Sequence, residues 1–196
     1  MNRKIVNFVL ATIVLAFTQA AEAQQTKKVA RIGLLAAGTP SAQAPYTEAF
    51  RLGLRDLGYI EGQKIAIEYR YAQEKLERQP ALAAELVSLK VDVILTGGAT
   101  GTRSAKEATN AIPIVMAQDP DPVGNGFVTS LARPGGNITG LSSLVAELGG
   151  KRLELLREVV PRLSRVAVLG TSTNPGNVQQ LRETELAAAA IRVRLQ

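Results

Sequence analysis

Short apolar runs alternate with amphipathic segments from residue 29 to residue 142. The runs are rich in β-branched and aliphatic residues, which is typical of buried strands. The segments between them carry apolar residues at helical spacing and are joined to the strands by short loops. We expect strands at Val29–Leu35, Ile65–Tyr71, Val91–Leu95, Ile112–Met116 and Ile138–Leu141, and helices at 46–57, Leu76–Leu89 and Thr100–Ala108. This alternation predicts an α/β fold of right-handed βαβ units on a parallel sheet.

The first helix carries a predicted inward stripe that includes Tyr46, Phe50, Leu54 and Leu57, and Gly58 is the residue expected to close it. The strand that follows, Ile65–Tyr71, has one apolar face and one mixed face. That pattern suits a strand near the edge of a sheet.

Residues 119–140 form the most heavily constrained connection in the chain. Three prolines and five glycines fall within these 22 residues. Pro120 and Pro122 stiffen the first part, because proline fixes φ and removes a backbone donor. The order Arg133-Pro134-Gly135-Gly136 predicts a type II turn, whose third residue must take a positive φ.

The alternation of helix and strand patterns begins again after residue 150. A helix over Lys151–Val160, a strand over Arg165–Leu169 and a helix over Gly176–Ile191 are expected, with Asn174 as N-cap and Pro175 at the first helical position. A strand such as Arg165–Leu169 needs neighbours, and each large aliphatic side chain left exposed forgoes about 1.5–3 kcal/mol. We therefore expect residues 151–196 to be loosely ordered or to associate with other chains, unless they pack on the preceding unit.

One stretch carries a family resemblance. The run SLARPGGNITGLSS, with IPIV and DPVG before it and KRLELLREVVP after it, resembles the ABC-transporter substrate-binding protein family of the type I periplasmic-binding fold. The resemblance extends from Val29 to the end of the chain. It implies two similar lobes around a ligand cleft, with a first lobe over 24–142 and a crossover and partial second lobe over 143–196. It also implies that the sequence is truncated within the second lobe, because a two-lobe receptor is about twice as long as one typical domain.

The first 23 residues read as a secretory signal peptide. Asn2-Arg3-Lys4 is a basic start, Ile5–Phe17 is mostly apolar, and Ala21-Glu22-Ala23 fits a cleavage site. The apolar run is shorter than the roughly 20 residues that a spanning helix needs. We therefore expect a periplasmic protein that is exported by a cleavable signal and has no stable membrane insertion afterwards.

Composition removes several functional classes. The chain has no Cys and no His, which excludes thiol nucleophiles, disulfides, zinc–imidazole sites and His-based catalysis. The net charge of +6 is spread among acidic residues and is not clustered with aromatics, so we expect no nucleic-acid partner. No cofactor or metal is expected either.

Ligands of parallel α/β sheets bind beyond the carboxyl ends of the strands. The candidate binding residues in these loops are Gly38, Thr39, Pro40, Gly97, Gly98, Thr100, Asp119 and Asn174. Gly97 and Gly98 would let the backbone approach a ligand, and the amides that open the next helix would hold an anion. Thr100 and Thr102 would add hydroxyl donors. The alternative is that the glycines only form a turn and one threonine only caps the helix.

Asp119 and Asp121 have two interpretations. One of them can accept a ligand amine, which would suit an amino-acid-like solute, or both can bind turn amides, as Asp next to Pro often does. Acid–base catalysis by this pair is not favoured.

The leading hypothesis is a non-enzymatic solute receptor that closes on a small organic molecule and delivers it to an ABC permease of the inner membrane. Amino acids are among the candidate solutes. One alternative is a non-functional fragment or a one-lobe interaction protein. A dinucleotide-dependent enzyme is less favoured, because no G-x-G-x-x-G follows a strand. A repressor effector domain would need a DNA-binding segment where the signal peptide lies.

Overall fold

The computed structural model describes residues 29–143, 148–170 and 175–196, and the signal-peptide prediction and Asn174 lie outside them. Its main feature is a five-stranded, fully parallel sheet in the order β2-β1-β3-β4-β5. This confirms the predicted α/β class and places β2 at an edge, as its mixed face indicated. The strands are β1 Ala30–Ala36, β2 Ile65–Tyr71, β3 Val93–Gly97, β4 Ile114–Asp119 and β5 Ile138–Ser142.

Three α-helices accompany this sheet: α2 Pro40–Asp56, α3 Gln79–Ser88 and α4 Ala99–Ala108. A 3-10 turn, η1 Leu76–Arg78, precedes α3, so Pro80 lies in the first turn of the helix, where proline is tolerated. All three fall where the sequence pattern placed them. The main difference is at α2, which begins earlier because Thr39 caps it and Pro40 occupies its first position.

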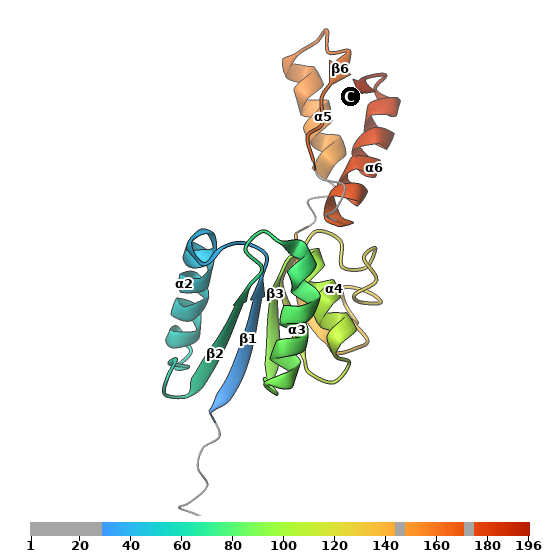
Figure 1. Cartoon of the computed structure of the whole chain (residues 1–196). Coiled ribbons are helices and arrows are strands. Elements are labelled where there is room, and N and C mark those ends of the chain that lie inside the picture. Colours follow the sequence, from blue (N-terminus) through green and yellow to red (C-terminus); the bar gives the residue numbers. More distant parts are fainter. Residues whose placement is uncertain (1–28, 144–147, 171–174) are drawn as a thin grey trace, which may run out of the picture.

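The main hydrophobic core lies on one face of the sheet. Figure 1 shows α3 and α4 over the face nearest the viewer, with α2 at the left beside β2 and β1. Leu82 and Leu86 of α3 pack there with residues of the strands such as Leu35, Ile94 and Ile114. No residue of α2 belongs to this core, and none of its side chains is fully buried.

The inward side of α2 differs from the predicted stripe. Phe50 and Leu54 are half-buried as expected, but Tyr46 is 74% exposed and Leu57 is 75% exposed. Helical spacing predicts which residues share one face of the helix, but it does not predict which face turns toward the sheet. In the structure, Gln43 and Thr47 are half-buried, and Tyr46 and Leu57 are exposed. The predicted end is confirmed: Gly58 has φ +80 and donates to Arg55 O, and the next N–H donates to Leu54 O.

A second group of elements follows the first sheet. It contains α5 Leu148–Val159, β6 Arg165–Val166, α6 Pro175–Ala190 and β7 Arg194–Leu195. The predicted strand Arg165–Leu169 is shortened to two residues, because its only partner in the described part of the chain is the short β7. Leu169 is consequently 99% exposed. The division at residues 142 and 143 and the loose order of this group remain predictions.

Candidate solute site at the carboxyl edge of the sheet

The carboxyl ends of β1, β3 and β4 meet at one edge of the sheet, because the strands are parallel and neighbours in the order. A cavity of about 900 Å³ begins at this edge and continues over the face of the sheet beside α2. We call the part at the strand ends the edge zone; it is lined by Ala37, Gly97, Gly98, Ala99, Gln118, Pro120 and Ser143. We call the part over the sheet the face zone. Ligands of parallel α/β sheets bind in this position, beyond the carboxyl ends of the strands.

The first turn of α4 opens into the edge zone. Gly98 is its N-cap with φ +88, and it has no side chain to satisfy the N–H groups of that turn. A Cβ built on Gly97 or Gly98 would meet nothing within 4 Å, so the approach to these amides is free. Thr100 is half-buried in the same turn. Free amides and the positive end of the helix dipole together suit a carboxylate or another anion.

Thr102 has a structural role. It is buried, its hydroxyl lies 2.8 Å from Thr96 Oγ1, and it donates to Gly98 O at 3.1 Å. These contacts tie α4 to the end of β3. The alternative that one threonine caps the helix is wrong, because Gly98 is the N-cap of α4 and no side chain caps it. Thr102 does not line the cavity either, so it is not placed to add a hydroxyl donor there.

Gly38, Thr39 and Pro40 lie at the same edge but outside the cavity lining. Thr39 Oγ1 accepts the Ala42 N–H at 3.2 Å as the cap of α2. The two residues before this loop, Ala36 and Ala37, line the cavity instead.

Asp119 is fully buried at the end of β4 and serves its own loop. Its Oδ1 accepts the Asp121 N–H at 2.9 Å and Asn125 Nδ2 at 3.0 Å, while its Oδ2 has no partner among the described residues. Burial raises the pKa of this carboxyl, and the two hydrogen bonds oppose that rise. Because Asp119 does not line the cavity, the geometry favours the turn interpretation.

Sequence reasoning missed several residues that border the cavity. Gln118 precedes Asp119, Gln43 and Tyr46 come from α2, Ser143 follows β5, and Gln180 comes from α6. Gln118 lies within the loop expected after the predicted strand Ile112–Met116, so the pattern could have identified it. Ser143 and Gln180 enter through the path of the chain after the sheet, which no local pattern reveals.

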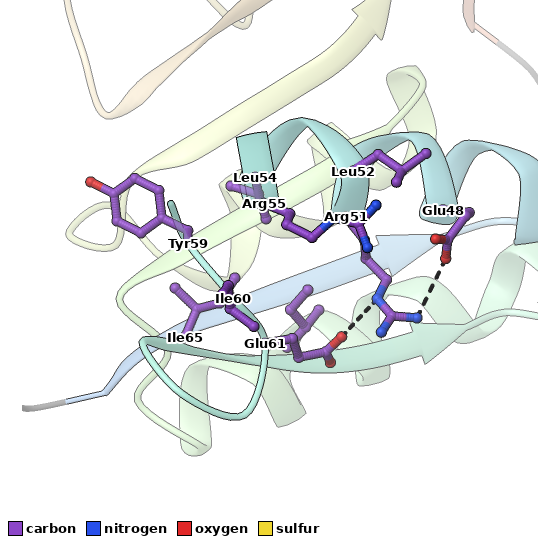
Figure 2. Close-up of a pocket in the computed structure, with 10 residues that line it drawn as sticks. Glu48, Arg51, Leu52, Leu54, Arg55, Tyr59, Ile60, Glu61 and Ile65 are labelled. Carbon is purple, nitrogen blue, oxygen red and sulfur yellow. Dashed lines mark hydrogen bonds and ion pairs between the residues drawn. The ribbon is translucent and has the colours of Figure 1, made fainter. Parts of the chain in front are cut away.

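A second, smaller cavity of about 110 Å³ lies between the last turns of α2 and the start of β2, at the opposite end of the strands (Figure 2). Arg51 crosses it, with Nε 2.9 Å from Glu61 Oε2 and NH1 3.4 Å from Glu48 Oε2. Tyr69 donates to Glu61 at 3.3 Å, and burial, with the charge of Glu61 next, raises the pKa of Tyr69 to about 12. Arg51 of α2 and Tyr69 of β2 both contact Glu61, which lies in the loop before β2, so we assign this cavity a structural role.

The comparisons with known proteins agree with this geometry. A family model described as ABC transporter substrate binding protein matches residues 25–196. The chain belongs to this family. Its members, and the solved structures that it resembles, are solute-binding proteins and not enzymes.

Three relatives of this substrate-binding protein illustrate the match. A tyrosine-binding protein of Clostridioides difficile is 34% identical over 122 residues, which are 62% of this chain and 35% of the relative. A conserved domain protein of Vibrio cholerae has a TM-score of 0.77 and 28% identity, and the match covers 86% of this chain and 56% of that one. An ABC domain from Streptococcus pneumoniae in complex with L-Trp has a TM-score of 0.75 and 22% identity over 85% of this chain and 56% of that one. The chain thus spans between a third and three fifths of these relatives.

The family is typically found outside the cytoplasmic membrane. Among the helices that the structure describes, none has both the length and the apolar character to cross a bilayer.

Proposed function

We propose that this protein is the solute-binding component of an ABC importer and that it captures a small, amino-acid-like organic solute between two lobes. The observation that carries the proposal is the uncapped first turn of α4, which opens into the edge zone. Its free amides suit the carboxylate of such a solute.

The relatives support an amino-acid-like solute. The Clostridioides relative is a tyrosine-binding protein at 34% identity. The Streptococcus structure holds L-Trp, but at 22% identity it supports the fold and not the solute. Tyrosine has a carboxylate and an aromatic ring, which suit the anion-binding turn and the mostly apolar cavity beside it.

The proposed mechanism requires no covalent chemistry. The solute binds the first lobe at the edge zone, the second lobe closes over it, and the closed form is favoured because it contacts the solute on both sides. In the cell, the signal peptide would deliver the protein to the periplasm, and the closed form would dock on an inner-membrane ABC permease.

A charge placed beside α4 tests the proposal. Gly97 has no positive φ and its Cβ position is empty, so Gly97→Asp and Gly97→Asn should both fold. The two variants have nearly the same shape, but only Asp carries a negative charge. We expect Gly97→Asp to bind L-tyrosine, L-tryptophan or L-leucine at least about 10-fold more weakly than Gly97→Asn, because like charges repel near the helix terminus.

Isothermal titration of the chain from Gln24 onward measures this difference. Tyramine lacks the carboxylate but keeps the ammonium group, so it is the matched solute control and should lose no affinity in Gly97→Asp relative to Gly97→Asn. The proposal is refuted if the folded protein binds none of the three amino acids at millimolar concentration. It also loses its structural basis if the Asp and Asn variants bind an amino acid with equal affinity.

A further inference from the structure

Two buried hydroxyl groups connect the middle of the sheet to the first turn of α4. Thr96 lies near the end of β3, where its register partners are Leu35 on β1 and Met116 on β4, so its backbone is held from both sides. Thr96 and Thr102 are both fully buried. Thr96 Oγ1 lies 2.8 Å from Thr102 Oγ1, which in turn lies 3.1 Å from Gly98 O. This chain of hydrogen bonds therefore ends on the carbonyl of the N-cap residue of α4.

The direction of donation along this chain is fixed. A threonine hydroxyl has one hydrogen to donate, and it can accept at the same time. Thr102 donates that hydrogen to Gly98 O, so it must accept in its contact with Thr96, whose hydroxyl is the donor. Gly98 O also accepts the backbone N–H of Thr102 at 3.2 Å. Two donors of one residue thus converge on a single carbonyl, and hydrogen bonds in series polarise one another.

The peptide unit between Gly98 and Ala99 is one that needs such support. Gly98 has φ +88 and ψ 167, a backbone region that essentially only glycine adopts. A planar trans peptide directs its C=O and its N–H in opposite directions. Because Gly98 O is held toward Thr102, the Ala99 N–H is directed away from the body of the helix. Ala99 lines the edge zone, and the N–H of a first helical residue has no acceptor within its own helix.

We propose that Thr102, supported by Thr96, is a positioning residue for the solute, because it holds this peptide unit so that the Ala99 N–H meets the solute carboxylate. The proposal rests on the proposed function, in which the edge zone receives a carboxylate. Thr102 does not line the cavity, so it acts through Gly98 and not by direct contact. A threonine that bonds the carbonyl four residues earlier also occurs in helices that bind nothing. The distinguishing property of a positioning role is therefore an effect on the carboxylate alone.

Gln79 provides a matched control. Its side chain is fully buried beneath the same turn, where Gln79 Oε1 lies 3.8 Å from the position of a Cβ on Gly101 and Thr96 Cβ lies 3.7 Å from that position. Neither polar atom of its carboxamide has a hydrogen-bond partner among the described residues. Gln79→Met therefore changes the packing beneath α4 without removing a hydrogen bond to Gly98. It should not destabilise the fold, because the polar group that it removes is buried without a partner.

The test is isothermal titration of the chain from Gln24 onward with L-tyrosine and with tyramine. Thr102→Val keeps the shape of the side chain but removes the hydroxyl, and Thr102→Ser keeps the hydroxyl. Thr102→Val should bind L-tyrosine at least about 5-fold more weakly than the parent protein, while Thr102→Ser and Gln79→Met should stay within about 2-fold. Tyramine, which lacks the carboxylate, should bind Thr102→Val as well as it binds the parent protein.

Thr96→Val is a second variant that leaves the bond from Thr102 to Gly98 in place and removes only its support. It should lose about 2- to 3-fold in affinity for L-tyrosine and nothing for tyramine. If Thr102→Val does not fold, as judged by circular dichroism, Thr96→Val decides the question by the same comparison of the two solutes.

Three results would overturn the positioning role while leaving the proposed function in place. They are an unchanged affinity of Thr102→Val for L-tyrosine, an equal loss for tyramine or in Gln79→Met, and a Thr102→Ser variant as weak as Thr102→Val, which would assign the effect to the methyl group. A parent protein that binds none of L-tyrosine, L-tryptophan and L-leucine would instead refute the proposed function, and the positioning role with it.

Discussion

Gly140 in β5 is the position at which a single methyl group should be most damaging. Its φ is +146, and a Cβ added there would lie 2.2 Å from Met116 O, 2.6 Å from Met116 N and 2.8 Å from Met116 C. These are backbone atoms of the neighbouring strand β4, so no side-chain rotation relieves the contact. We predict that Gly140→Ala strongly destabilises the first lobe.

The magnitude follows from two contributions. A side chain held in a backbone region that suits glycine costs about 1–3 kcal/mol. Relief of the clash requires β5 to move away from β4 by about 1 Å, and overpacking of this kind costs about 1–3 kcal/mol. The sum of about 2–6 kcal/mol is a large share of a typical stability of about 5–15 kcal/mol. With a urea m-value of about 2 kcal/mol/M, the unfolding midpoint should fall by at least about 1 M.

Gly53→Ala is the matched control. Gly53 lies in α2, nothing lies within 4 Å of its Cβ position, and it has no positive φ. Alanine should therefore stabilise that helix by about 0.5–1 kcal/mol. Urea unfolding followed by circular dichroism measures both variants. If the urea midpoint of Gly140→Ala lies within about 0.3 M of that of the parent protein, the close approach of Gly140 to Met116 is not present in solution.

Two further substitutions test buried polar groups. Burial raises the pKa of Asp119 in the folded state, so its contribution to stability is present below the unfolded-state pKa and is lost as the pH rises through the folded-state pKa. The parent protein should therefore gain stability relative to Asp119→Asn as the pH is lowered from about 7 to about 4, and urea midpoints that differ by a constant amount over this range would contradict the raised pKa. Thr102→Val should cost about 1–3 kcal/mol, because it leaves the buried Thr96 hydroxyl without its partner. The double variant Thr96→Val/Thr102→Val should cost less than the sum of the single changes, and additive thermal shifts would show that the two hydroxyls do not interact.

Periodicity was sufficient to predict the elements of the first lobe. The strands β1 to β5 and the helices α3 and α4 lie within a few residues of the predicted ranges, because each has a strong apolar pattern bounded by glycine, proline or a polar loop. Gly135 also has the positive φ, +80, that the predicted type II turn requires.

The parts that were not predictable depend on contacts between distant residues. The rotation of α2 goes with contacts such as the ion pair between Arg51 and Glu61, in the loop before β2, which a helical period does not encode. Arg165–Leu169 has the composition of a full strand, yet only two of its residues pair, because strand length depends on neighbours as well as on propensity.

The candidate site was predictable at the level of loops but not of side chains. Topology places Gly97 and Gly98 at the carboxyl edge, and the structure opens them to the cavity. Topology also places Asp119 at the carboxyl end of β4, but local hydrogen bonds hold its carboxylate against its own loop. The choice between a ligand contact and a turn contact depends on one side-chain rotation, and nothing in a single sequence fixes it.

Under the proposed two-lobe mechanism, the end of β5 limits where a pivot can begin. The N–H of Ser143 donates to Asp119 O at 2.9 Å, which fastens the first residue after β5 to the last residue of β4. A rotation of the second lobe that preserves this bond can begin only beyond Ser143. The same bond places Ser143 beside the loop after β4 that borders the edge zone.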